Sequence, residues 1–142
     1  MHKILVVGSK NTYRSIIVSE YLKKVLKDNA KTETEVLSAG IMAFPDIPAE
    51  PEAVESLGQI GISGGFKSGP LSKQAVMDAV LILTMSEKIK NAILGKFPDI
   101  QSKIFTFTFF FTGTESELAA APDFARKAAA MIDGNKEKVL SI

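Results

Sequence analysis

The chain has 142 residues, of which 46% are hydrophobic, enough to bury the core of one domain. Its 17 basic and 16 acidic residues give a net charge of +1, which argues against a nucleic-acid-binding surface. It has no cysteine, which excludes disulfides, thiolate metal ligands and a cysteine nucleophile, and the single histidine, His2, is too little for a metal centre. We therefore expect one domain over residues 1–142, with no metal and no cofactor.

The hydrophobic residues form no run that approaches the roughly 20 residues needed to cross a bilayer. The chain enters an apolar segment directly after Lys3, without the features of a secretory signal. We therefore expect a cytoplasmic protein that makes no membrane contact.

The first part of the chain alternates between apolar strands and an amphipathic helix. Residues 2–7 contain four consecutive aliphatic side chains, which is typical of a strand buried on both faces of a parallel sheet. Residues 35–39 are predicted to form a second strand, which Gly40 closes. Between these strands a helix is expected to end near Asn29, because hydrophobic residues recur at helical spacing, at Ile17, Val18, Tyr21, Leu22, Val25 and Leu26.

The central part is predicted to hold two helices and a third strand. Prolines at positions 45 and 48 favour an irregular segment, and Pro51 suits the first turn of a helix that Gly61 ends. Ser72 is a candidate cap for a short second helix, and residues 79–84 are predicted to form the third strand. The inward face of the first of these helices is expected to comprise Val54, Leu57 and Ile60.

The last third is predicted to hold two more helices and a fourth strand. Ser86 is a candidate cap for a helix that ends before Phe97. Residues 103–111 are predicted to form the fourth strand, because phenylalanine alternates with threonine along most of them. Three consecutive phenylalanines, Phe109–Phe111, exceed what a strand end usually buries, so part of them is expected at the surface. A final helix is expected to begin at Pro122 and to end at Gly134.

Strands that alternate with helices predict a three-layer α/β domain with a mostly parallel sheet. In such sheets ligands bind beyond the carboxyl ends of the strands, where the strand order reverses. The segment Gly8–Ser15 lies at such an end, between the first strand and the first helix. Backbone N–H groups and the positive end of the helix dipole favour an anion there, and Arg14 adds a charged fork that fits phosphate oxygens.

The residue types of this segment support the interpretation as an anion site. Gly8 is its only glycine, which excludes a Walker P-loop and a dinucleotide fingerprint. Asn11 tolerates left-handed dihedral angles, Ser15 can form a hydrogen bond across the loop, and Lys10 adds positive charge at the rim. With phosphate or a phosphorylated side chain as the ligand, the predicted phosphate-binding residues are Gly8, Ser9, Lys10, Asn11, Thr12, Tyr13, Arg14 and Ser15.

This segment resembles the active-site loop of the low-molecular-weight protein tyrosine phosphatases, whose pattern is Val-Cys-x-Gly-Asn-x-Cys-Arg-Ser-Pro. Here the residues from Val7 to Ile16 are Val-Gly-Ser-Lys-Asn-Thr-Tyr-Arg-Ser-Ile. The resemblance covers about the first 105 residues and implies a four-stranded parallel sheet flanked by helices, with the phosphate loop after the first strand. Further matching segments are Ser38-Ala39-Gly40, Gly61-Ile62, Pro70-Leu71, Leu81-Ile82-Leu83-Thr84-Met85, Phe97-Pro98 and Lys103-Ile104-Phe105.

The chain departs from the family pattern at the residue that would attack phosphorus. The family's nucleophile is the first Cys of the loop, and the residue at that position is Gly8, which has no side chain. Ser9 is one residue away and is expected to point elsewhere. Tyr13 stands at the second Cys position, where a phenol with an ordinary pKa of about 10 is a poor nucleophile. Lys10 replaces the loop glycine and would be strained if that position needed unusual dihedral angles.

The general acid of the family is not assigned in this chain. The resemblance implies an Asp in an Asp-Pro-aromatic motif on a late loop, and the similar composition of Pro122-Asp123-Phe124 makes Asp123 a candidate. The spacing instead points upstream, to Glu115, Ser116 or Glu117. A non-catalytic alternative is that Asp123 lies in the first turn of a helix, where the dipole favours an acidic residue.

The resemblance implies a phosphatase homologue that has lost most or all of its activity and kept the phosphate-binding half of its site. Whether it is an enzyme is left open, with the balance against activity. One alternative is a weakly active hydrolase that uses Ser9 or water, and another is a scaffold or homodimer that associates through Tyr13 or Phe109–Phe111. Artificial replacement of the cysteines is a further alternative, although Lys10 and Ile16 indicate natural divergence.

Overall fold

The computed structural model describes residues 1–115, 118 and 123–142. Its central strand, β1, pairs in parallel with β2 along its whole length and with β3 over four residues. The aliphatic residues of β1 are no more than 1% exposed, as expected for a continuous apolar run in the interior of a parallel sheet. The sheet has the order β2-β1-β3-β4, and its strands are β1 His2–Gly8, β2 Thr34–Gly40, β3 Leu81–Thr84 and β4 Ile104–Thr106.

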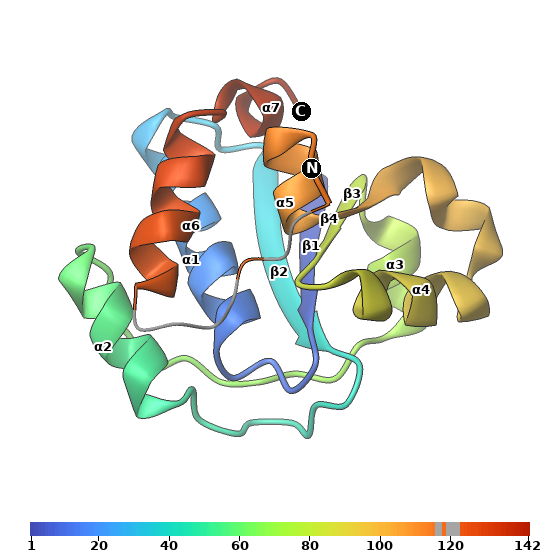
Figure 1. The fold of residues 1–142 in the computed structure, drawn as a ribbon, viewed down its shortest axis with the longest axis horizontal. Helices are drawn as coiled ribbons and strands as arrows, with labels where there is room; N and C mark the ends of the chain where they lie inside the picture. The colour runs from blue at the N-terminus through green and yellow to red at the C-terminus, as the bar shows by residue number, and fades with distance from the viewer. Residues whose placement is uncertain (116–117, 119–122) are drawn as a thin grey trace.

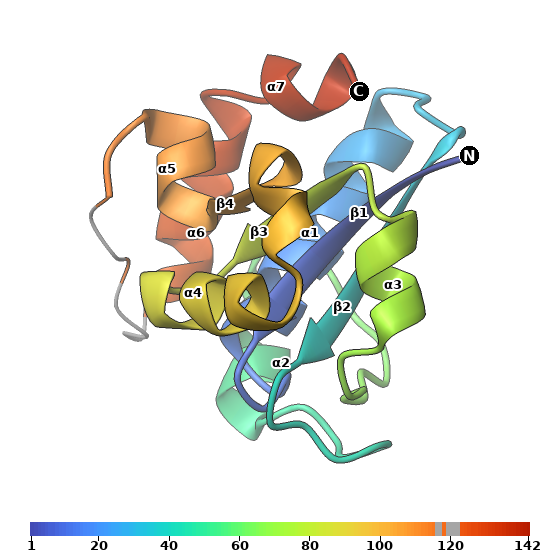
Figure 2. The same cartoon turned by 90° about the vertical axis from the view of Figure 1, so that its right-hand side faces the viewer.

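Helices cover both faces of this sheet. On one face lie α1 (Arg14–Asp28) and α6 (Phe124–Asp133), and on the other lie α3 (Lys73–Asp78) and α4 (Glu87–Lys96) (Figure 1). The view turned by 90° places α3 and α4 in front of the strands (Figure 2). The prediction of a three-layer domain with a four-stranded parallel sheet is therefore confirmed.

Serine side chains begin two of the helices. Ser72 accepts a hydrogen bond at Oγ from the N–H of Ala75 (3.1 Å) at the start of α3. Ser86 accepts one at Oγ from the N–H of Ile89 (3.2 Å) at the start of α4. Such caps satisfy N–H groups that have no partner inside the helix, which explains why both starts could be predicted from the sequence.

The helix α2 (Pro51–Gln59) begins at the predicted proline, but its inward face differs from the prediction. Leu57 is buried as expected, whereas Val54 is 41% exposed. Ala53 and Ser56 are buried in its place, because they share with Leu57 one stripe of the helix at spacings of three and four residues. Gly61 follows the helix with a φ of 84°, a left-handed value that glycine adopts without strain.

The prediction of a long fourth strand is wrong. β4 ends at Thr106, and Phe107–Thr112 form the helix α5 instead. Thr106 caps α5 by accepting a hydrogen bond from the N–H of Phe109 (3.3 Å). Phe107 and Phe111 pack with ring centroids 5.3 Å apart. These two residues fit the alternation of a strand, but they also fit the spacing of a helix, so the cap and the packing decide between the two.

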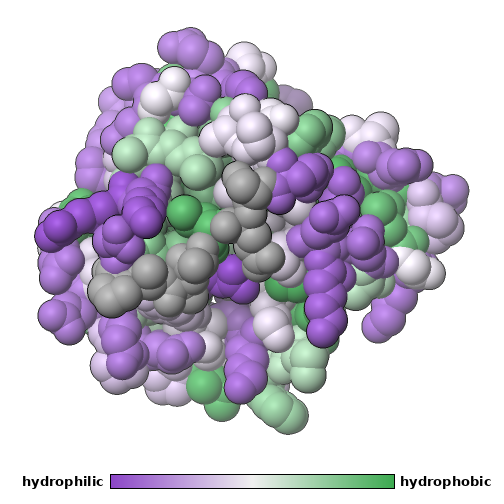
Figure 3. Space-filling view, in the orientation of Figure 1, coloured by the Kyte–Doolittle hydropathy of each residue, from purple (hydrophilic) through white to green (hydrophobic). Residues whose placement is uncertain are grey.

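The surface distribution of the aromatic run agrees with the expectation that only part of it is buried. Phe111 is 1% exposed and Phe109 is 37% exposed. On the face shown in Figure 3, hydrophilic residues dominate and the hydrophobic ones gather in small separate patches. Within residues 1–115, 118 and 123–142, no helix is long and apolar enough to cross a membrane.

The final helix of the predicted fold is α6, which ends before Gly134 as expected. Its predicted start, Pro122, lies outside the described residues. Besides α5, two short elements of the described chain were not predicted, namely the 3-10 helix η1 (Pro98–Lys103) and the helix α7 (Glu137–Leu140).

Candidate functional site

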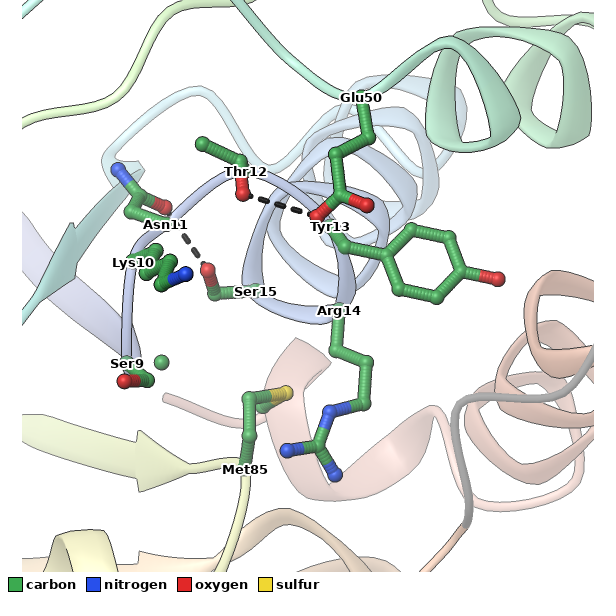
Figure 4. Close-up of a pocket in the computed structure, with 10 residues that line it drawn as sticks. Ser9, Lys10, Asn11, Thr12, Tyr13, Arg14, Ser15, Glu50 and Met85 are labelled. Carbon is green, nitrogen blue, oxygen red and sulfur yellow. Dashed lines mark hydrogen bonds between the residues drawn. The ribbon is translucent and has the colours of Figure 1, made fainter. Parts of the chain in front are cut away.

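The loop of residues 8–15 connects the carboxyl end of β1 to the first turn of α1. β1 lies between β2 and β3, so this loop is at the point where the strand order reverses, the usual place for a ligand in an open α/β sheet. The loop surrounds a pocket of about 230 Å³ (Figure 4). The structure therefore brings together all the residues that were predicted to bind phosphate, and Glu50 and Met85 complete the lining.

Two buried polar residues hold the loop in shape. Asn11 and Ser15 are each 2% exposed, and the Ser15 hydroxyl donates a hydrogen bond to Oδ1 of Asn11 (2.8 Å). Asn11 has a φ of 58°, so the predicted left-handed conformation and the predicted hydrogen bond across the loop are both confirmed. Lys10 does not have a positive φ, so the strain considered for this position is absent.

The backbone of the loop leaves donors available around the pocket. The carbonyl oxygens of Gly8, Ser9 and Thr12 accept hydrogen bonds from the N–H groups of residues 41, 42 and 50, outside the loop. In contrast, the N–H groups of residues 10–12 have no acceptor within the described part of the chain. Unpaired N–H groups next to the start of α1 form the kind of environment that favours an anion.

Arg14 brings a permanent positive charge to the same pocket. It is the first residue of α1, and its side chain extends from the helix start toward Met85 (Figure 4). Its Nη1 lies 3.5 Å from the carbonyl oxygen of Leu118, which places that residue of the late loop next to the pocket. Lys10 is exposed at the rim and adds a second positive charge.

The two side chains that were considered as replacement nucleophiles, Ser9 and Tyr13, both make contacts of their own. Ser9 directs its hydroxyl toward the sulfur of Met42 (3.9 Å), so the expectation that it points elsewhere is confirmed. Tyr13 packs against Phe124, with ring centroids 6.1 Å apart. Burial, together with the carboxylates of Glu50 and two other acidic residues, raises the pKa of Tyr13, which keeps its phenol protonated at neutral pH.

The two candidate acids within the described residues, Asp123 and Glu115, lie outside the pocket lining. Asp123 is the residue just before α6, one position ahead of the first turn in which a non-catalytic role was considered for it. Its carboxylate lies 3.3 Å from Nζ of Lys127. Glu115 accepts a hydrogen bond from Oγ1 of Thr106 (3.5 Å). Residues 116 and 117, the other two candidates, lie outside the described residues. A general acid is therefore still unassigned.

Sequence reasoning missed two pocket residues. Met85 directly follows β3, so it lies at the carboxyl end of a strand next to β1. The rule that ligands bind at the carboxyl ends of parallel strands could have pointed to it. Glu50 accepts a hydrogen bond at Oε2 from the Thr12 hydroxyl (3.0 Å), and its own N–H donates to the Thr12 carbonyl oxygen (2.9 Å) (Figure 4). No local signal marks Glu50, because its position depends on the path of the whole segment between β2 and α2.

The fold and the pocket together define an α/β protein with a candidate ligand loop after its first strand. More specifically, the chain belongs to the low molecular weight phosphotyrosine protein phosphatase family, whose model matches residues 3–132. A protein-arginine-phosphatase of Bacillus subtilis (strain 168) is 32% identical over 115 residues, which are 81% of this chain and 76% of that protein.

Solved structures agree with this assignment. The YwlE arginine phosphatase from Geobacillus stearothermophilus has a TM-score of 0.86 and 28% identity, over 99% of this chain and 94% of that one. A serine variant of YwlE arginine phosphatase, with its active-site serine phosphorylated, has a TM-score of 0.83 and 25% identity, over 98% and 93% of the two chains. The resemblance that the sequence motifs indicated is thereby confirmed.

Proposed function

We propose that this chain is a non-catalytic member of its family that binds a phosphate group in the loop of residues 8–15. The observation that carries the proposal is the pocket itself, where unpaired backbone N–H groups and Arg14 surround a space that contains no nucleophilic side chain at position 8. Donors directed at one point stabilise a phosphate dianion. Without an attacking atom the bond that joins phosphorus to the side chain of the ligand stays intact. We also propose the cytoplasm as its location.

The rim of the pocket supports a phosphorylated arginine side chain as the ligand. All three similar proteins described above are named as arginine phosphatases. Glu50 places a carboxylate beside the Thr12 hydroxyl at the pocket edge. A carboxylate there repels plain phosphate but attracts the guanidinium of phosphoarginine, while Arg14 holds the phosphate end. We therefore expect phosphoarginine to bind more tightly than phosphotyrosine.

Calorimetric titration with inorganic phosphate, phosphoarginine and phosphotyrosine tests the proposal. Arg14→Ala is expected to weaken binding of all three by about tenfold to hundredfold, because it removes a charge-assisted hydrogen-bond donor. Arg126→Ala is the matched control, since Arg126 is exposed on α6 and is not part of the pocket lining. It carries the same change in charge and is expected to leave the affinities unchanged.

Turnover of an aryl phosphate is measured on the same preparations, and none is expected from the natural sequence. Turnover that Arg14→Ala abolishes would support the alternative of a hydrolase that works without cysteine. If the natural sequence binds none of the three ligands, the proposed function is wrong.

We propose self-association as a second candidate function, because aromatic side chains remain exposed at the β4 edge of the sheet. Phe109 is stacked on Phe105, with ring centroids 6.4 Å apart, and is still 37% exposed. Phe110 packs beside Phe105 at 5.8 Å. An exposed aromatic group of this kind is typical of a protein contact. The Tyr13 surface stays a prediction.

A further inference from the structure

The space that a side chain would need at position 8 is already occupied. A Cβ atom added to Gly8 would lie 2.8 Å from Oγ of Ser15 and 3.0 Å from its Cβ. Carbon and oxygen atoms that are not bonded to each other do not approach this closely without displacement. Met85 is the next neighbour, with its Cγ 3.8 Å away. The missing side chain has therefore left no hole, because the Ser15 side chain forms the floor of the pocket at this point.

The Ser15 hydroxyl is held at this place by a buried partner, Asn11, which has one unpaired hydrogen-bond donor. Its proton is directed at Oδ1 of Asn11 (2.8 Å), and both side chains are 98% buried, since each is 2% exposed. Nδ2 of the same Asn11 amide has no acceptor within the described part of the chain. A buried donor without an acceptor is unfavourable, so an arrangement that supplies one is favoured.

We propose that the Ser15 hydroxyl has replaced the missing thiol as the floor of the site and donates its proton directly to the bound phosphate. The inference rests on the proposed phosphate binding by the loop of residues 8–15. When the ligand enters, the Asn11 amide turns over, so that Nδ2 donates to Oγ of Ser15 and the Ser15 proton turns to a phosphate oxygen. The unpaired buried donor is thereby satisfied and the ligand gains a donor, while Oδ1 of Asn11 gives up the proton that it accepted from Ser15.

The replacement changes the sign of the interaction at the floor. A thiolate at position 8 would be an anion facing a phosphate dianion, and the two would repel each other. A neutral hydroxyl at the same place attracts the dianion through a hydrogen bond. The pair of Gly8 and Ser15 thus favours a ligand that is held without reaction.

A double-mutant cycle on the full chain tests this role, with the dissociation constant of inorganic phosphate measured by calorimetry at fixed salt. Ser15→Ala is expected to weaken binding by about tenfold to hundredfold, the effect of one hydrogen bond to a charged group. Gly8→Ala is expected to weaken it to a similar degree, because the added methyl group displaces the Ser15 hydroxyl. The double variant is expected to bind phosphate no more weakly than the single variant with the lower affinity, because both substitutions remove the same hydrogen bond.

Ser19→Ala is the matched control for the loss of a buried hydroxyl from α1. Ser19 is 1% exposed, and its hydroxyl donates to the Ile16 carbonyl oxygen, away from the pocket. The phosphate affinity of this variant is expected to equal that of the natural sequence. Circular dichroism and thermal unfolding check that each variant is folded.

A measurement on the natural sequence alone covers the case in which Ser15→Ala does not fold. Phosphate is expected to shift the side-chain amide resonances of Asn11 in nuclear magnetic resonance spectra. Those of Asn29, whose Nδ2 already donates to the Val25 carbonyl oxygen (2.7 Å), are expected to stay in place.

Two outcomes separate this inference from the function on which it rests. In the first outcome, phosphate binds and Arg14→Ala weakens this binding, but Ser15→Ala leaves the affinity unchanged or phosphate does not shift the Asn11 amide resonances. The role of Ser15 is then wrong and the proposed function stands. If phosphate does not bind to the natural sequence, both are wrong.

Discussion

At the scale of single residues, the shape of the pocket depends on a close approach at Gly40. This residue ends β2, and a Cβ atom there would lie 2.4 Å from the carbonyl oxygen of Ser9 and 3.0 Å from the backbone N of Asn11. Both neighbours are backbone atoms of the loop of residues 8–15, so neither can move without moving the loop. Only glycine lets the end of β2 support the loop from this distance.

Gly40→Ala is therefore expected to lower the free energy of unfolding by about 2 kcal/mol, through overpacking against backbone atoms. Phosphate binding is expected to weaken as well, because the loop must shift. Urea unfolding and calorimetry measure the two effects.

Gly58→Ala is the matched control for this substitution. Gly58 lies in α2, and an added Cβ would meet nothing within 4 Å. It is expected to raise the stability by about 0.5–1 kcal/mol, because alanine is the better helix former. A Gly40→Ala variant as stable as the natural sequence would contradict the close approach.

At the scale of elements, a hydrogen bond joins the helices α1 and α6 on one face of the sheet. The Tyr21 hydroxyl lies 2.7 Å from each carboxylate oxygen of Asp133. Burial, followed by the hydrogen bond to Asp133 and its charge, raises the pKa of Tyr21 from 10.0 to about 12. The folded state therefore favours the neutral phenol more strongly than the unfolded state does.

This shift predicts how stability depends on pH. A raised pKa contributes stability that is fully present below pH 10.0, the unfolded value, and that is lost as the pH rises to about 12. At pH 8 the natural sequence is expected to exceed Tyr21→Phe by about 1 kcal/mol in free energy of unfolding, the net value of a hydrogen bond. The difference is expected to shrink above pH 10, which denaturant unfolding at several pH values would measure.

Asp133→Asn serves as the control, because it keeps an acceptor for the Tyr21 hydroxyl and removes the charge. In that background the loss of stability above pH 10 is expected to be smaller and to end at a lower pH, because the pKa of Tyr21 in the folded state lies closer to its unfolded value. If the difference in free energy of unfolding between the natural sequence and Tyr21→Phe stays constant from pH 8 to pH 12, the contact with Asp133 does not raise the pKa of Tyr21.

At the scale of the whole molecule, the exposed aromatic side chains of β4 and α5 predict association of two copies. Light scattering over a range of concentrations is expected to show dimers for the natural sequence and monomers for Phe109→Asp, because a charge cannot be buried in an apolar contact without cost. Phe44→Asp is the control, since Phe44 is 75% exposed in the segment after β2. A concentration-independent monomer would refute the association.

The order of the elements and the location of the loop could be predicted because their signals are local. The apolar run of β1, the serine caps at Ser72 and Ser86 and the stop at Gly134 each depend on residues within a few positions of one another. The family resemblance extended this to a four-stranded parallel sheet and to Gly8 as the residue at the position of the family's nucleophile.

The sequence by itself thus determined the first three strands, the start of the fourth, the loop and the residues that line most of the pocket. The tertiary structure alone decided that the phenylalanines after Thr106 form a helix, that Glu50 reaches the pocket, and that Ser15 fills the space beside Gly8. The physical reason is distance along the chain. A strand or a cap is stabilised by its neighbours in sequence, whereas these contacts form only when segments far apart pack together and exclude each other's atoms.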